Sequence, residues 1–327
     1  MDFELHFKGN QNIKILQITD MQVIDGHQRR YPERLTGWTL TEWVPENDEK
    51  NIYAHIRCLV DKTSPDLIII TGDIIYGEFD DSGRSFEKFV QFMDSLAIPW
   101  APVFGNHDNE SDKGVQWQCE QFENAKYALF ARGNIYGNGN YTIGIFRDEK
   151  LERTIYMLDS NGCGERGIEP GFREDQLAWA EEHAKAIHRE HGDVKAFMCF
   201  HIPTDDFLEA YIHAGYQSEY DVCENKFAKF IIGQDTPARN GDFGEKNEAI
   251  YACCRQKILP LLKVCKVDGV FVGHCHRINT SVLYEDIRFT FGYKTGYYDY
   301  HDENANGGTL ITLEKDQKFR VEHVKYE

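Results

Sequence analysis

The sequence lacks long hydrophobic runs and an excess of positive charge. No stretch approaches the roughly 18 consecutive apolar residues of a membrane-spanning helix, and residues 1–14 mix polar and apolar side chains, unlike a secretion signal. We therefore expect no membrane partner. The 36 lysines and arginines against 54 aspartates and glutamates give a net charge of −18, which disfavours a duplex nucleic-acid partner because such binding depends on basic side chains.

The sequence also lacks a disulfide pattern. Its nine cysteines are odd in number and scattered, and two of them, Cys253 and Cys254, are adjacent. This usage favours a reducing, cytoplasmic location over a disulfide-stabilised secreted protein. Core-forming residues are plentiful: 41% of the chain is hydrophobic and 13% aromatic, which excludes a disordered or fibrous protein.

Apolar segments alternate between strand and helix periodicity in the first half of the chain, and the last part reads as antiparallel strands. The predicted strands are 13–19, 67–70, 100–104, 141–146, 153–158, 195–200, 269–272, 280–283, 287–291, 309–313 and 319–324. The predicted helices are 51–62, 84–96, 113–124, 174–190 and 248–264. We expect a single domain over residues 1–327, of the α/β (α+β) class, with two sheets face to face and helices outside. The polar segment 202–246 is expected to be an insert that lies over the cleft and sets substrate choice.

Five of the apolar runs end in residues that bind metals or transfer protons. These endings are Asp20, Gly72-Asp73, Gly105-Asn106-His107-Asp108, His201 and Gly273-His274-Cys275-His276. In layered α/β folds the carboxyl ends of strands meet at one crevice, so these side chains are expected to lie together. Carboxylate, amide and imidazole ligands indicate a site for Mn, Fe or Zn.

Each ending has an ordinary explanation when it is considered alone. Asp20 and Gly72-Asp73 are common turn residues, and His201 could be a core histidine. The Gly-His-x-His pattern is more specific, because about 0.04 occurrences are expected by chance at this composition. The joint occurrence of all five endings favours a functional site.

This motif series resembles that of the calcineurin-like metallophosphoesterase superfamily, which reads D-x-H, G-D, G-N-H-[D/E], H and G-H-x-H. The resemblance implies a four-layer αββα sandwich of two mixed sheets with a site for two divalent or mixed-valence transition-metal ions. It makes Asp73 the bridging carboxylate. It assigns Asp20 and His276 to the first metal, and Asn106, His201 and His274 to the second.

The resemblance also implies a catalytic role for His107 as proton donor to the leaving group, with Asp108 fixing its orientation. The alternative for His107 is anion binding without proton donation. Lys294, in the segment 293–298, could meet a phosphate at the cleft mouth, although ordinary packing is the more frequent explanation for such a segment.

The first motif departs from the family pattern, because Gln22 stands where the family has histidine. Gln22 offers only an amide oxygen, which is a weaker ligand for these ions. The run Gly72-Asp73-Ile74-Ile75-Tyr76 resembles the purple acid phosphatase branch, in which a tyrosine three residues after the aspartate binds ferric iron. Tyr76 is therefore a candidate phenolate ligand, and the alternative is an aromatic packed at a strand exit.

We interpret the sequence as that of a binuclear metal-dependent phosphoesterase that hydrolyses a phosphate monoester or diester by attack of a metal-bound hydroxide. Its substrate is expected to be a small phosphorylated molecule or a phosphoprotein. The alternative is a protein of the same fold that has lost one metal through Gln22 and acts as an interaction scaffold. The sequence does not indicate an oligomeric state.

Overall fold

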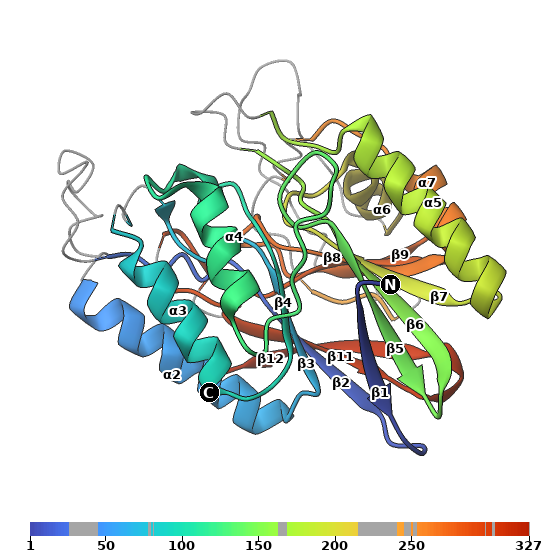
Figure 1. Ribbon diagram of the computed structural model, residues 1–327, viewed down its shortest axis with the longest axis horizontal. Coiled ribbons are helices and arrows are strands. Elements are labelled where there is room, and N and C mark those ends of the chain that lie inside the picture. The colour runs from blue at the N-terminus through green and yellow to red at the C-terminus, as the bar shows by residue number, and fades with distance from the viewer. Residues whose placement is uncertain are drawn as a thin grey trace.

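The computed structural model describes residues 1–25, 45–77, 80, 82–162, 169–214, 241–244, 250, 254–297, 299–302 and 305–326, with only the backbone described for residues 45–49. In this part of the chain, two β-sheets lie between two groups of helices (Figure 1). The four-layer αββα arrangement expected from the sequence is confirmed.

The first sheet has five strands in the order β12-β11-β2-β3-β4. Their bounds are β2 Ile13–Ile18, β3 Leu67–Thr71, β4 Trp100–Val103, β11 Gly307–Leu313 and β12 Phe319–Lys325. The strands β2, β3 and β4 run parallel, whereas β11 pairs antiparallel with both β2 and β12. The parallel strands are almost wholly buried and apolar, as expected for a sheet that is covered on both faces.

The second sheet has seven strands in the order β1-β5-β6-β7-β8-β10-β9. Their bounds are β1 Phe3–Phe7, β5 Tyr141–Arg147, β6 Lys150–Met157, β7 Lys195–Cys199, β8 Val267–Val272, β9 Ser281–Tyr284 and β10 Ile287–Phe291. Parallel and antiparallel pairs occur in this sheet too, so both sheets are mixed.

Side chains of β7 show how the layers are held together. Ala196 and Met198 belong to the hydrophobic core beside helices α5 (Glu174–His191), α6 (Asp205–Ala214) and α7 (Leu259–Val264). Phe197 and Cys199 belong to the core shared with the five-stranded sheet. Because successive side chains of a strand point to opposite faces, this alternation covers both faces of the sheet.

Helices α2 (Pro45–Thr63), α3 (Arg84–Ser95) and α4 (Gly114–Asn124) lie on the other side of the molecule (Figure 1). Phe86, Phe89 and Met93 of α3 are buried in the same core as the residues of β3. The spacing of these three residues places them on one face of the helix, which explains why α3 packs against the sheet.

The structure differs from the predicted elements in three places. Helix α7 is limited to Leu259–Val264 instead of extending from 248, because Pro260 fits only the first turn of a helix. The edge strand β1 was not predicted. The expected insert at 202–246 begins with α6, whose Phe207 and Tyr211 are buried; residues 215–240 and 245–246 lie outside the described residues.

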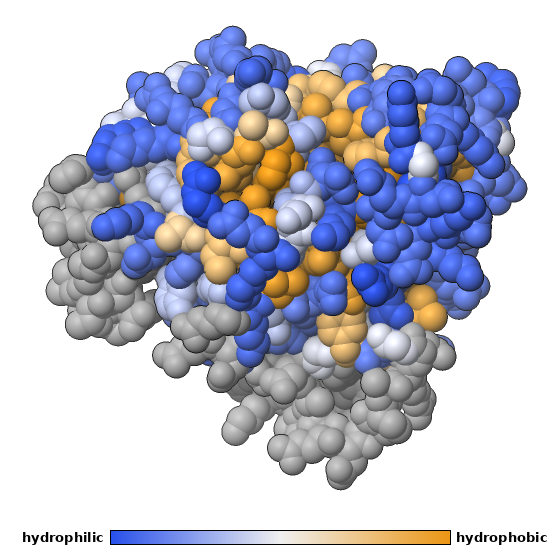
Figure 2. All heavy atoms as spheres, turned by 90° about the horizontal axis from the view of Figure 1, so that it is seen from below, coloured by the Kyte–Doolittle hydropathy of each residue, from blue (hydrophilic) through white to orange (hydrophobic). Residues whose placement is uncertain are grey.

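None of the described helices is long and apolar enough to cross a membrane. The face seen from below is largely hydrophilic, with hydrophobic atoms exposed between polar residues (Figure 2). The strands β2, β3, β4, β7 and β8 all run directly into the five motif endings, so the fold brings those endings to one region.

Candidate metal centre

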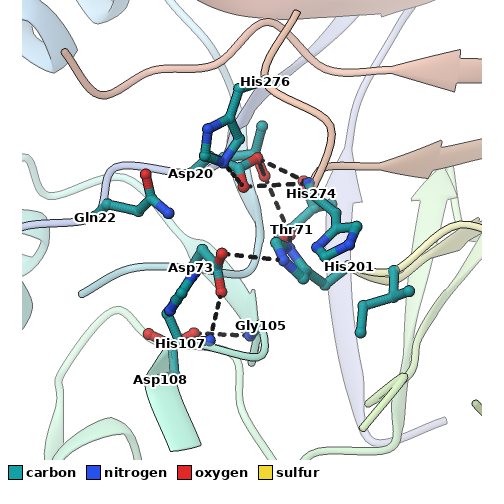
Figure 3. A network of polar contacts seen from close by, with 12 residues as sticks. Asp20, Gln22, Thr71, Asp73, Gly105, His107, Asp108, His201, His274 and His276 are labelled. Atoms are coloured by element: carbon teal, nitrogen blue, oxygen red, sulfur yellow. Dashed lines mark hydrogen bonds and ion pairs between the residues drawn. The ribbon is translucent and has the colours of Figure 1, made fainter. Parts of the chain in front are cut away.

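Three buried side chains form the centre of the site. Asp20 follows β2, Asp73 lies two residues after β3, and His276 lies four residues after β8. Each offers a ligand atom, and these atoms all lie within 4.8 Å of one another. Carboxylate oxygens and an imidazole nitrogen so close together are a suitable ligand set for a first-row transition-metal ion (Figure 3).

Two histidines direct Nε2 of the ring toward these carboxylates. His201 Nδ1 donates to the carbonyl of Thr71 at 2.7 Å, and His276 Nδ1 donates to the carbonyl of Tyr300 at 2.9 Å. Because a carbonyl can only accept, Nδ1 of each ring carries a proton, and Nε2 is the nitrogen that can bind a second proton or a metal ion. His201 Nε2 lies 3.3 Å from Asp73 Oδ2, and His276 Nε2 lies 3.4 Å from Asp20 Oδ1.

A ring nitrogen that faces a carboxylate oxygen in a buried site needs a cation between the two atoms, either a proton or a metal ion. A backbone carbonyl on the other ring nitrogen is the usual outer partner of a metal-binding histidine. Both histidines therefore fit metal ligation on an observation independent of the motif pattern.

Asn106 and His274 complete the group. Asn106 directly precedes His107, and the backbone N–H of His107 donates to Asp73 Oδ1 at 2.9 Å. Asn106 Oδ1 is buried without a hydrogen-bond partner among the described residues. The His274 ring lies edge-on to His201, with 5.2 Å between ring centres. The structure thus brings Asp20, Asp73, His201, His274 and His276 together, and it places Asn106 in the loop whose backbone contacts Asp73.

The backbone at this centre is strained. Asp20, Gln22, Asp73 and His274 have φ angles of 52°, 48°, 50° and 74°, in the left-handed region that L-residues rarely adopt. The neighbouring glycines leave room for the approach of separate strands. A Cβ on Gly273 would lie 2.0 Å from Thr19 Oγ1 and 2.6 Å from Asp20 Oδ2, so the ends of β2 and β8 meet only because this residue is glycine.

The prediction that Asp108 orients His107 is wrong. Asp108 is fully buried, and its carboxylate accepts from the backbone N–H groups of Ile74, Ile75 and Gly105 at 2.9, 3.0 and 2.7 Å. It therefore ties the loop after β3 to the loop after β4. The partner of His107 Nδ1 is Glu110 Oε2, at 2.8 Å.

Glu110 was missed by the sequence analysis, although its position three residues after His107 could have suggested it. The residues Asp108–Glu110 form a single 3₁₀ turn, and side chains three residues apart in such a turn lie on the same side. The ring of Tyr76 stacks on His107 with 4.2 Å between ring centres, an arrangement that packing alone explains.

Charges within the centre shift several pKa values. Burial alone would lower the pKa of His107, but the carboxylates of Asp73 and Glu110 raise it to about 10. Burial also opposes protonation of His201, yet Asp73 raises its pKa to about 9. Burial and the neighbouring His201 lower the pKa of His274 to about 3.

The pKa values of the buried carboxylates shift in both directions. Burial favours their neutral forms, but His276 and His201 lower the pKa of Asp20 to about 2, and His201 and His107 hold the pKa of Asp73 below its usual range. Burial and the charge of Asp73 raise the pKa of Asp108 to about 7. Asp20 and Asp73 are therefore charged at neutral pH and can bind a cation.

Gln22 and Lys294 form a contact that the sequence did not predict. Lys294 is 1% exposed, and its Nζ lies 2.5 Å from Gln22 Oε1 and 3.1 Å from the carbonyl oxygen of Asp20. The amide oxygen of Gln22, expected to be a weak metal ligand, thus accepts from Lys294. Burial and this ammonium group both lower the pKa of His276.

Comparisons with known proteins agree with this geometry. The family model described as calcineurin-like phosphoesterase matches residues 13–277. The phosphatase DCR2 of Saccharomyces cerevisiae is 33% identical over 179 residues, which are 49% of this chain but only 30% of the yeast protein. A protein of Arabidopsis thaliana named probable inactive purple acid phosphatase 29 is 24% identical over 323 residues, which cover 91% of this chain and 75% of the plant protein.

Two solved structures share the fold. A dimetal phosphatase from Danio rerio superposes with a TM-score of 0.55 at 13% identity, over 96% of each chain. Purple acid phosphatase PPD1 from yellow lupin superposes with a TM-score of 0.52 at 13% identity, over 97% of this chain and 52% of the lupin chain.

Proposed function

Because the chain belongs to the calcineurin-like phosphoesterase family, we propose that it is a binuclear metal-dependent phosphoesterase that hydrolyses a phosphate monoester or diester. The observation that carries this proposal is the pair of histidines, His201 and His276, whose Nε2 atoms face the carboxylates of Asp73 and Asp20 while Nδ1 of each ring donates to a backbone carbonyl. An interaction scaffold needs no such arrangement.

In this proposal Asp73 would serve both ions, Asp20 and His276 would hold the first, and Asn106, His201 and His274 would hold the second. Two transition-metal ions, such as Mn, Fe or Zn, supply Lewis-acid stabilisation of a phosphoryl group and a water nucleophile at neutral pH. The protein fixes these ligands through outer hydrogen bonds, including that from Thr19 Oγ1 to Asp20 Oδ2 at 2.8 Å.

His107 is the proposed proton donor. Glu110 accepts from its Nδ1, so the imidazolium directs its Nε2 proton elsewhere, and this proton is available to the departing oxygen. A cationic His107 also binds the phosphoryl anion, so the two roles considered for it require the same protonated ring. The stacked ring of Tyr76 restricts the orientation of His107.

Tyr76 remains the proposed phenolate ligand for a preparation that contains ferric iron. A visible charge-transfer band that disappears in Tyr76→Phe would support this role. The same band in the variant, or its absence from iron-loaded wild type, would leave Tyr76 as a packing residue.

We further propose a single domain over residues 1–327 and a cytoplasmic location. Cys58, Cys119, Cys199 and Cys265 are free thiols, as expected in a reducing compartment. The substrate class is a small phosphorylated molecule or a phosphoprotein. The name of the yeast relative, a phosphatase, supports a phosphoesterase activity.

The second candidate function is a scaffold that has lost the first metal. It is favoured by the engagement of Gln22 Oε1 by Lys294 and by relatives named probable inactive purple acid phosphatases.

Hydrolysis of p-nitrophenyl phosphate and bis-p-nitrophenyl phosphate, with and without added manganese, zinc or iron, tests the proposal. We expect metal-dependent turnover of one ester, reduced at least about a hundredfold in Asn106→Ala. No turnover of either ester by the metal-loaded protein would favour the scaffold. Equal turnover by Asn106→Ala would contradict the site assignment.

A further inference from the structure

The side-chain amide of Gln22 has a defined orientation. Its neighbour Lys294 carries an ammonium group, which has only hydrogen-bond donors. The amide atom that lies 2.5 Å from Lys294 Nζ must therefore be the oxygen, and the amide nitrogen must point away from Lys294. The donor-only chemistry of the ammonium group therefore sets the orientation of the amide.

The amide nitrogen points toward the metal centre. The backbone N–H of Gln22 donates to the backbone carbonyl of Asp73 at 2.9 Å, which fixes Gln22 beside that residue. In Figure 3 the side-chain nitrogen of Gln22 lies on the side that faces Asp73. Gln22 is 0% exposed, and its Nε2 has no hydrogen-bond partner among the described residues.

An unpaired amide N–H in a buried site costs free energy, and an amide –NH₂ group cannot bind a metal cation. An anionic oxygen that enters the centre would provide the missing acceptor. The phosphoryl group of the proposed substrate carries such oxygens, and a hydrogen bond to a charged oxygen is stronger than one between neutral groups.

We propose that Gln22 is a substrate-binding residue that donates from Nε2 to a phosphoryl oxygen, and that Lys294 is the positioning residue that orients the amide. This inference rests on the proposed phosphoesterase function and deepens it. It replaces the weak metal ligand expected at position 22 with a hydrogen-bond donor. The first metal then relies on Asp20, Asp73 and His276.

The test titrates inorganic phosphate into the metal-loaded protein by calorimetry and measures bound metal by elemental analysis. In Gln22→Leu we expect unchanged metal content and a phosphate Kd that is about tenfold to a hundredfold higher. Loss of metal from Gln22→Leu would show that Gln22 is a ligand. An unchanged Kd would show that it binds no phosphate. Either result overturns the inference.

Gln22→Glu provides a second variant of nearly the same size. Its carboxylate still accepts from Lys294 but presents an oxygen where Gln22 presents N–H. We expect phosphate binding at least as weak as in Gln22→Leu, and undiminished binding would contradict the proposal even if Gln22→Leu failed to fold. Gln176→Leu removes another fully buried amide, in α5, and is expected to reduce stability without changing the phosphate Kd.

A double-mutant cycle tests the positioning role of Lys294. Lys294→Met frees the amide to rotate, so we expect weaker phosphate binding in the wild-type background and little further effect in Gln22→Leu. A purely structural or electrostatic effect of Lys294 would be the same in both backgrounds, and that result would overturn its assigned role.

The two proposals fail in different ways. If the wild-type protein binds neither metal nor phosphate, the proposed function itself fails. If it binds both and hydrolyses an ester while Gln22→Leu binds phosphate equally well, only the inference about Gln22 fails.

Discussion

The imidazole of His107 is oriented by Glu110, whose Oε2 accepts from Nδ1 at 2.8 Å. The carboxylate of Asp108 is occupied by three backbone N–H groups and does not serve this role. Residues three apart in a turn face the same side, whereas adjacent residues point in different directions.

Glu110→Gln tests the role of Glu110. Removing its charge lowers the pKa of His107, and we expect kcat to fall about tenfold to a hundredfold with unchanged metal content. Steady-state kinetics and elemental analysis measure both quantities. A wild-type kcat would show that His107 does not need Glu110.

Asp108→Asn is the matched comparison. We expect this substitution mainly to lower the melting temperature, because it weakens the bonds that join the two loops. An Asp108→Asn protein with wild-type stability would contradict the structural role assigned to this carboxylate.

His323 predicts a pH dependence of stability away from the metal centre. Its Nε2 donates to the carbonyl of Asn279 at 2.5 Å, and its Nδ1 accepts from Thr309 Oγ1 at 2.9 Å. Thr309 Oγ1 in turn accepts from the backbone N–H of Tyr293. These bonds require the neutral ring. Burial accordingly lowers its pKa to about 4 in the folded protein, compared with about 6.5 in the unfolded chain.

Between pH 6.5 and pH 4 the unfolded chain therefore binds the proton more readily than the folded protein. The stability from His323 is complete above about pH 6.5 and is lost as the pH falls toward 4, by up to about 3 kcal/mol. Urea unfolding of wild type and His323→Gln at pH 7 and pH 4.5 measures this difference. A stability difference between the two proteins that is the same at both pH values would contradict it.

At the scale of elements, the ends of strands were the most predictable feature. Asp20, Asp73, His201 and His276 were placed together from the rule that carboxyl ends of neighbouring strands share a crevice. The position of Lys294 at this centre was not predicted, because its contact with Gln22 joins residues 272 positions apart through the loop after β10. A single sequence gives no signal for such a contact.

The strands and helices also differ in how well the sequence predicted them. Strands β2, β3 and β7 were predictable because they are short, largely apolar and buried. Strand β1 alternates half-buried and exposed residues at the edge of its sheet, which is a weaker signal. Helix α7 was predicted too long because Pro260 was not taken as a helix start.

Gly273→Ala tests the close approach of β2 and β8. An added Cβ would overlap Thr19 Oγ1 and Asp20 Oδ2, so we expect about 1–3 kcal/mol of destabilisation and reduced metal content. Gly114→Ala is the comparison for backbone strain: its φ of 75° disfavours alanine, but no atom lies within 4 Å of the added Cβ, so we expect it to lose stability and keep its full metal content. Thermal unfolding and metal analysis check both variants. Full metal content in a stable Gly273→Ala protein would contradict the packing argument.

At the scale of the whole molecule, the two sheets bring the ends of their strands together at one centre. The five-stranded sheet supplies Asp20, Asp73, Asn106 and His107, and the seven-stranded sheet supplies His201, His274 and His276. The two sheets therefore contribute different parts of one centre: the five-stranded sheet supplies both carboxylates, and the seven-stranded sheet supplies three of the four histidines. Binding of metal ions at this interface is expected to stabilise the folded protein.

The most direct test of the central claim is the metal content of the purified protein. Elemental analysis of iron, manganese and zinc is expected to give about two ions per chain, with a large loss in Asp73→Asn because this carboxylate is proposed to serve both ions. One ion or none in the wild type after reconstitution, or an Asp73→Asn protein with full metal content, would contradict the binuclear centre.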